Sequence, residues 1–334
     1  MVPERPTGAP PVARGMTNRR GRGDRVFLSG VSLSGLLVLV VMGAVGVFLA
    51  IEASDALQSK GWSFLTTSEW QPDRNEFGIA AVLVGTVLIA LVAVVVAVPI
   101  AMGTALFITE VAPTWLRSWL VALVDLMAAV PSVVYGLWGL FFLQDKIIGL
   151  SRWLNAWFGW LPFLDVARAD PNSPLASESV YTASAFIAGL VVAMMVMPIS
   201  CVVMREVFSQ VPLGEREGAY ALGSTRWGMI RVVALPFGKG GIIGGTMLGL
   251  GRALGETIAV LLIISPRFDI NFHILEAGGN SVSSLIAART FESTGFGRSA
   301  LMAAGLALFA ITLVVNFTAS SFVARSRSGA SSEA

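Results

Sequence analysis

Residues 240–264 read GGIIGGTMLGLGRALGETIAVLLII, and this stretch decides the fold. It is long enough to cross a bilayer, because a spanning helix needs about 20 apolar residues. Its only charges are Arg252 and Glu256. Charged side chains at membrane depth are costly and usually mark the path of a solute. The stretch therefore predicts a membrane helix that carries a polar site.

Five other runs of the chain have the same apolar character. Hydrophobic residues make up 55% of the sequence and charged residues only 13%, about half the share that is usual in soluble proteins. We therefore expect an all-α polytopic membrane protein with six transmembrane helices and no second soluble domain. Asp125 and Pro131 interrupt the third run, which makes it the least regular. The expected spans are Val26–Ile51, Gly78–Ile108, Leu116–Leu143, Tyr181–Met204, Gly240–Ile264 and Ala300–Ala324.

The positions of arginine and lysine orient these spans, since basic residues concentrate in cytoplasmic loops. Six arginines lie in residues 1–25, and five basic residues lie between the fourth and fifth spans, in residues 205–239. With six spans, both segments and both chain termini fall on the cytoplasmic side. We expect a disordered basic tail at 1–25 that touches anionic lipid, a membrane domain at 26–324, and a short cytoplasmic tail at 325–334.

The polar segment 205–239 has a helical texture. The acidic residues of Glu215-Arg216-Glu217 suit a first helical turn, and Gly223 then interrupts the pattern. A second short helix begins near Thr225 and should stop at Pro236. Ala219 and Gly223 leave one face of this segment nearly bare of side chains. The segment therefore predicts a compact docking surface for another protein.

Nucleotide and metal sites are not expected within the chain. The glycine–lysine pair at residues 238–239 lacks the features of a phosphate-binding loop, since Val233 stands where that motif needs glycine and Gly240 where it needs serine or threonine. Cys201 is the only cysteine and His273 the only histidine. We therefore expect no cofactor, no metal site and no hydrolytic activity, so that any ATP hydrolysis belongs to a partner.

Arg252 and Glu256 are the strongest candidates for a substrate site. Each charge would cost roughly 2.5–3.5 kcal/mol at mid-span, and if the run is one helix they lie one turn apart on one face. A guanidinium beside a translocation path can pair bidentately with an oxyanion. Glu256 would hold the arginine or accept a proton from the substrate, and a purely structural ion pair is the alternative. Ser132 and Thr257 are candidate donors to the substrate.

The fifth run is also rich in glycine. Gly241 and Gly245, Gly245 and Gly249, and Gly251 and Gly255 are each four residues apart. Such spacing lets helices pack backbone to backbone in a membrane. We expect this helix to lie inside the bundle or at a subunit interface.

The polar segment resembles the EAA loop of ABC importer permeases, whose pattern is E-A-A-x3-G-x9-I-x-L-P. Two positions depart mildly from it, with Gly218 for an alanine and Val233 for the isoleucine. In that family the loop docks in a cleft of the ATPase subunit. The resemblance therefore implies ATPase-coupling roles for Glu217, Gly218, Ala219, Gly223, Leu235 and Pro236.

A narrower resemblance follows. Residues 249–260, GLGRALGETIAV, are similar to the signature of the C-type permease subunit of the phosphate-specific (Pst) ABC transporters, and residues 101–113, 130–136 and 205–208 agree. The resemblance implies the type I importer permease fold in a bacterial cell membrane. It implies a heterodimer with an A-type permease subunit, two ATP-binding subunits at the cytoplasmic face, and an extracytoplasmic phosphate-binding protein. No nucleic-acid partner is expected.

Two other functions remain open at this point. A permease for another oxyanion, such as sulfate or molybdate, would share the docking loop. A secondary transporter or channel would need no ATPase, but it often shows two similar halves, and none is visible. Asp125 is a weaker candidate for the site, with pairing to a neighbouring helix as the simpler role.

Overall fold

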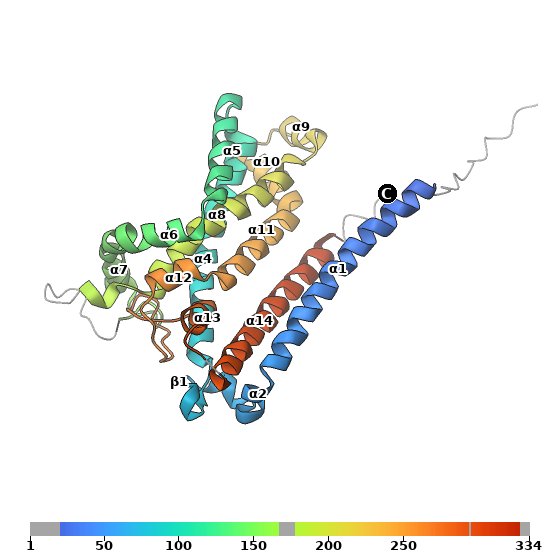
Figure 1. The fold of residues 1–334 in the computed structure, drawn as a ribbon. Coiled ribbons are helices and arrows are strands. Elements are labelled where there is room, and N and C mark those ends of the chain that lie inside the picture. The colour runs from blue at the N-terminus through green and yellow to red at the C-terminus, as the bar shows by residue number, and fades with distance from the viewer. Residues whose placement is uncertain (1–20, 167–177, 294, 328–334) are drawn as a thin grey trace, which may run out of the picture. The chain divides into compact units, whose positions relative to one another are not determined.

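The computed structural model describes residues 21–166, 178–293 and 295–327, and most of them are helical (Figure 1). Six described helical stretches are long and apolar enough to cross a membrane, which confirms the expected polytopic all-α fold. Residues 1–20 and 328–334, with most of the two expected tails, lie outside the described residues. The six stretches are Gly23–Glu52, Ala80–Val111, Ser132–Phe158, Ala185–Ser209, Arg226–Gly255 and Phe296–Thr318.

The chain divides into two units, residues 1–48 and 49–334. The described part of the first unit belongs to α1 (Arg22–Glu52). Its apolar side chains are exposed along the helix, from Val26 to Phe48. A helix that is apolar on all sides is suited to lipid or to a protein surface within the membrane.

Three helices form the core of the second unit: α4 (Ala80–Leu106), α8 (Ala185–Ser209) and α11 (Leu235–Gly255). The central helix α8 packs against both of the others. Ser184 caps the start of α8 by accepting a hydrogen bond from the backbone N–H of Ile187. Close contact with α4 depends on Gly189, because a Cβ at that position would lie 2.6 Å from the Cβ of Val92.

The glycine spacing of α11 has the predicted effect along one face. A Cβ at Gly241 would lie 2.6 Å from the Cβ of Val207 on α8, and a Cβ at Gly249 would lie 2.6 Å from Cγ1 of Val196. Gly245 approaches the α8 backbone in the same way. The glycines of α11 therefore make room for valine side chains of α8 and, at Gly245, for its backbone, so that the two helices pack closely.

The third expected span is displaced along the chain. Pro131 has no N–H and favours an extended conformation in the residue before it, and Val130 is extended with ψ 129°. The run expected as Leu116–Leu143 is therefore broken, and the stretch long enough to span begins at Ser132. Before the break lies α5 (Thr114–Ala129). The stretch after it consists of α6 (Ser132–Trp138), the π-helical turn η3 (Gly139–Leu143) and α7 (Gln144–Phe158).

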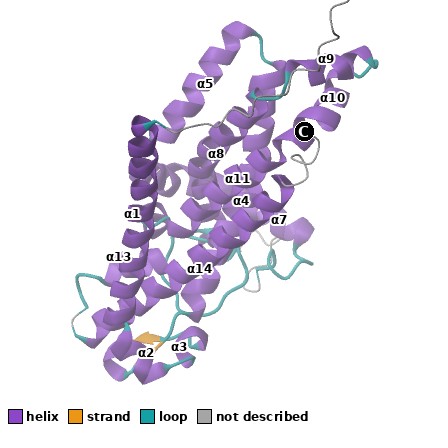
Figure 2. Cartoon of the chain, turned by 90° about the vertical axis from the view of Figure 1, so that its right-hand side faces the viewer, coloured by secondary structure: helices purple, strands orange, loops and turns teal. Residues whose placement is uncertain are grey.

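The connections of the second unit gather at opposite ends (Figures 1 and 2). One end, called the coupling end, carries α9 (Leu213–Ala221) and α10 (Arg226–Met229). The opposite end, called the outer end, begins with α2 (Ser54–Lys60), α3 (Ser63–Thr66) and a hairpin of β1 (Trp70–Gln71) and β2 (Glu76–Phe77) joined by η1 (Pro72–Arg74). The remaining elements of that end are η4 (Glu178–Tyr181), α13 (Val282–Arg289) and the start of α14 (Phe296–Arg327).

Candidate functional site

The apolar run that ends at Ile264 is not one helix. It breaks at Glu256, whose backbone is extended with ψ 125°, and a short helix α12 (Ile258–Ile263) follows. The expectation that Arg252 and Glu256 share one helical face is therefore wrong, because only Arg252 lies within α11. The break leaves backbone groups at this depth that need partners from elsewhere in the fold.

Glu256 supplies some of those partners itself. It is only 8% exposed, and its carboxylate accepts a hydrogen bond from the backbone N–H of Ala259 at 3.3 Å. That N–H belongs to the first turn of α12, where a helix has no internal acceptor for it. The backbone oxygen of Glu256 accepts a hydrogen bond from the hydroxyl of Ser283 on α13 at 2.7 Å. Glu256 thus holds the ends of α11, α12 and α13 together.

Arg252 lies in the last turn of α11, and its side chain is exposed within this chain. Among the described residues, no ion pair joins it to Glu256. The guanidinium is therefore available to a ligand or to another subunit, and it is not held by Glu256 as one hypothesis required.

The other two candidate residues lie on elements that pack together. A Cβ at Gly136 on α6 would lie 2.9 Å from the Cα of Ala259 on α12, so the two short helices meet closely (Figure 1). Ser132 is in the first turn of α6 and is half-buried. Thr257 immediately precedes α12, and its hydroxyl donates to the oxygen of Gly255 at 3.1 Å. The fold therefore brings α6 next to α12, so that Gly136 of residues 130–136 meets Ala259 of residues 249–260.

At the coupling end, α9 stops at the glycine that interrupted the sequence pattern. Gly223 has φ +82°, which glycine adopts without the strain that a side chain brings. The backbone N–H groups of Gly223 and Ser224 donate to the oxygens of Tyr220 and Ala219 at 2.9 and 3.1 Å. This is a Schellman C-cap. Thr225 then caps α10 by accepting from the N–H of Gly228 at 3.2 Å.

The predicted ATPase-coupling residues have different environments in this segment. Glu217 and Gly218 are exposed, whereas Ala219 is partly buried. The helix that begins at α10 does not stop at Pro236, as predicted, but continues through the π-helical turn η5 (Ile230–Ala234) into α11. Pro236 is tolerated because it occupies the first turn of α11, and a π-helical turn relaxes the normal hydrogen-bond ladder before it.

Residues 97–328 match the family described as binding-protein-dependent transport system inner membrane component. The chain belongs to this family. It is 40% identical over 284 residues to the phosphate transport system permease protein PstC of Pasteurella multocida, covering 84% of this chain and 85% of that protein. It is 38% identical over 302 residues to PstC 2 of Mycobacterium tuberculosis, covering 89% and 91%.

A solved structure shares the fold. The crystal structure of a bacterial ABC transporter involved in the import of the acidic polysaccharide alginate matches with a TM-score of 0.52 at 16% identity, over 90% of this chain and 98% of that one. At that identity the likeness concerns the fold alone. It agrees with assignment of this binding-protein-dependent permease to the type I importer permease fold.

Two ion pairs lie at the coupling end of this permease, and the sequence reasoning missed the first of them. Arg216 on α9 lies 3.1 Å from a carboxylate oxygen of Glu110, which is in the π-helical turn η2 (Phe107–Val111) that follows α4. Asp125 on α5 lies 3.7 Å from Arg205 on α8, so pairing with a neighbouring helix is the role that the structure shows for it. The sequence held two signals for the pairing of Glu110 with Arg216: a carboxylate at the end of an apolar run and an arginine in the polar segment.

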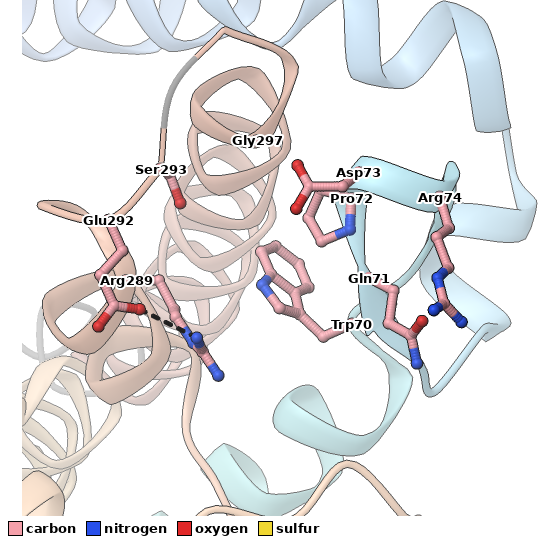
Figure 3. A pocket seen from close by; sticks show the side chains of 9 residues that line it. All are labelled: Trp70, Gln71, Pro72, Asp73, Arg74, Arg289, Glu292, Ser293 and Gly297. Atoms are coloured by element: carbon pink, nitrogen blue, oxygen red, sulfur yellow. Dashed lines mark hydrogen bonds and ion pairs between the residues drawn. The ribbon is translucent and has the colours of Figure 1, made fainter.

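A polar pocket lies at the outer end of the permease, away from the candidate site. It has a volume of about 460 Å³ and lies between the β1–β2 hairpin and the connection from α13 to α14. Figure 3 shows the Trp70 indole facing Arg289, which forms an ion pair with Glu292 at 3.0 Å. The pocket wall also carries Asp73 and Arg74. Both signs of charge are present, so the pocket favours neither cations nor anions.

Within the part of the chain that the structure describes, no three histidine, cysteine or acidic side chains are grouped as metal ligands would be. Cys201 is buried as a free thiol in α8.

Proposed function

We propose that this chain is a transmembrane permease subunit of an ATP-driven importer of inorganic phosphate, the C-type subunit of a Pst system. The observation that carries the proposal is its likeness, at 37–40% identity over most of its length, to permease proteins named for phosphate transport. Family membership and the type I permease fold agree with it. The chain itself forms a path for the solute and performs no hydrolysis.

The path in this proposal runs along the exposed side of α11. Arg252 is on that side, and Gly244 and Gly255 have nothing within 4 Å of where a Cβ would stand. A paired A-type permease subunit would cover this side and complete the path. Arginine is suited to phosphate because its planar guanidinium can donate two parallel hydrogen bonds to one oxyanion. Ser132 and Thr257 are the proposed hydroxyl donors nearby.

The coupling end in this proposal faces the cytoplasm and receives one of two ATP-binding subunits. Basic residues concentrate in this segment, as they do in cytoplasmic loops. The exposed face of α9, with Glu217 and Gly218, would enter a cleft of the ATPase subunit, and Gly223 would fix where α9 ends. The outer end would then face the extracytoplasmic phosphate-binding protein, with both chain termini in the cytoplasm of a bacterial cell.

The proposed path is tested by uptake of radiolabelled phosphate into vesicles that contain the whole transporter. Arg252→Gln should abolish uptake while the subunits still co-purify. Arg252→Lys is the matched control for charge, and it should retain only part of the uptake because a lysine cannot form the bidentate contact. Normal uptake by the glutamine variant would reject the role of Arg252. Transport of sulfate or molybdate in preference to phosphate would reject the substrate.

Glu256 requires a separate pair of variants, because two roles are possible for a carboxylate there. Glu256→Gln keeps an oxygen that can accept from the Ala259 N–H but cannot take up a proton at neutral pH. Glu256→Ala removes the acceptor. We expect the glutamine variant to keep most of its uptake and the alanine variant to lose it, since the geometry favours a capping role. Loss of uptake in both variants would instead support proton acceptance.

A further inference from the structure

One buried ion pair joins the docking helix to the membrane core. The side chain of Glu110 is only 3% exposed and that of Arg216 is 21% exposed, with 3.1 Å between their charged atoms. The same guanidinium nitrogen donates to the backbone oxygen of Phe208 at 2.9 Å. Arg216 lies on α9, Glu110 in the turn that ends α4, and Phe208 in the last turn of α8. A single side chain thus connects three elements at the coupling end.

The connection extends to α11. Gly238 packs directly on the ring of Phe208, leaving no room for a Cβ. Among the described residues, no hydrogen bond reaches Oε1 of Glu110. The negative charge of this carboxylate is therefore balanced by the positive charge of Arg216. An uncompensated buried charge is strongly unfavourable. The ion pair therefore opposes any separation of α9 from the ends of α4 and α8.

We propose that Glu110 and Arg216 form the joint through which displacement of α9 moves the membrane helices. Both are positioning residues, acting on Arg252 and the break at Glu256 through the helices that they tie together. The inference rests on the proposed function, in which an ATPase subunit displaces α9. It adds a specific link between that movement and the membrane core, formed by a carboxylate that no partner subunit can touch.

Because the side chain of Glu110 is buried, its substitution separates an effect inside the permease from an effect on the docking surface. An effect of Arg216→Gln alone would also arise if Arg216 touched the ATPase subunit. Glu110→Gln changes no exposed atom of the docking surface and keeps the size of the side chain. Arg117→Gln is the matched control, because Arg117 is exposed on α5, outside the polar segment, and has no ion pair among the described residues.

The first measurement uses the assembled transporter with its phosphate-binding protein. In Glu110→Gln and in Arg216→Gln we expect phosphate imported per ATP hydrolysed to fall by about five- to tenfold, within the range usual for coupling between sites. Co-purification of the ATPase subunits should be unchanged. The double variant should be no worse than either single variant, because the two residues act as one unit. Arg117→Gln should keep the wild-type ratio.

The outcomes separate coupling from stability. A lower yield or melting temperature, combined with a wild-type ratio of phosphate to ATP in the assembled complex, would show that the ion pair is only structural and overturn the proposal. Fully additive losses in the double variant would do the same. A Glu110→Gln complex with a reduced ratio and intact assembly would support it.

A second measurement does not depend on the transported solute. Amide hydrogen exchange is followed in residues 107–111 of the complex, with and without a non-hydrolysable ATP analogue. We expect the nucleotide to change the exchange protection of this turn in the wild-type complex. The change in Glu110→Gln should be smaller by a factor of about three or more. Equal changes in both would overturn the joint. If wild-type vesicles import no phosphate but this difference persists, the proposed substrate fails while the joint stands.

Discussion

Replacing Gly249 with alanine tests the contact between α8 and α11. The new Cβ would lie 2.6 Å from Cγ1 of Val196 and 2.7 Å from the hydroxyl of Ser200. Because carbon atoms prefer a separation of about 3.5 Å or more, Val196 must move by roughly 0.9 Å. Valine has one preferred rotamer in a helix, so rotation offers little relief. The Ser200 hydroxyl would also be pushed from its hydrogen bond to the oxygen of Gly245.

The size of the effect follows from comparison with Gly244 on the same helix. A Cβ there has nothing within 4 Å, so Gly244→Ala gains about 1 kcal/mol of helix propensity or less and loses no packing. The same gain accompanies Gly249→Ala, where overpacking costs typically 1–3 kcal/mol. The difference between the two variants isolates the overpacking, and we expect Gly249→Ala to be about 1–3 kcal/mol less stable than Gly244→Ala.

Unfolding of the full chain in mixed micelles by graded addition of SDS measures this difference. The double variant Gly249→Ala with Val196→Ala provides a further check, because it removes the carbon that collides. Its loss should be smaller than the sum of the two single losses by at least about 1 kcal/mol. If Gly249→Ala and Gly244→Ala agree within about 0.5 kcal/mol, α8 and α11 do not touch through glycine as described.

Three further predictions concern other contacts. Gly223→Ala should cost about 1–2 kcal/mol because alanine is strained at φ +82°, and it should weaken co-purification of the ATPase subunits more than Gly214→Ala, whose Cβ would meet nothing within 4 Å. Asp125→Asn should change the SDS unfolding free energy by less than about 1 kcal/mol, because the carboxylate is 52% exposed and lies 3.7 Å from Arg205; a larger loss would show that this pair supports the bundle. Gly136→Ala should cost about 1–3 kcal/mol and slow phosphate uptake, because its Cβ would press on backbone of α12, which no rotamer change relieves. Wild-type uptake and stability in that variant would argue against close packing of α6 on α12.

Hydropathy and glycine spacing predicted the spanning helices because both depend on local sequence. Residues 78–108 and 181–204 correspond to spans at Ala80–Val111 and Ala185–Ser209, with small shifts at the ends. The third span failed because a hydropathy window averages across Pro131 and does not register that the chain turns there. The glycine spacing was informative for Gly241, Gly245 and Gly249, which pack on α8, whereas a Cβ at Gly255 would meet no described residue within 4 Å.

The sequence predicted the details of the candidate site less completely. Arg252 was identified correctly as a charge on the fifth helix, but the break at Glu256 was not foreseen. That break is stabilised by a hydroxyl from Ser283, on an element later in the chain, and such partners leave no local pattern. The pairing of Glu110 with Arg216 likewise depends on how α4 and α9 meet in space. Contacts of this kind follow from tertiary packing, which one sequence does not specify.

The continuous helical stretch from Arg226 to Gly255, which includes the π-helical turn η5, has a mechanical consequence. At about 1.5 Å per residue, Arg226 and Arg252 are separated by about 39 Å along its axis. A rod of this length acts as a lever arm, and a tilt of about 5° around one end moves the other by about 3 Å. That displacement equals the length of a hydrogen bond, roughly 2.9 Å. If Arg252 binds the solute as proposed, a small rotation of α10 at one end would bring the guanidinium into or out of reach of an anion at the other.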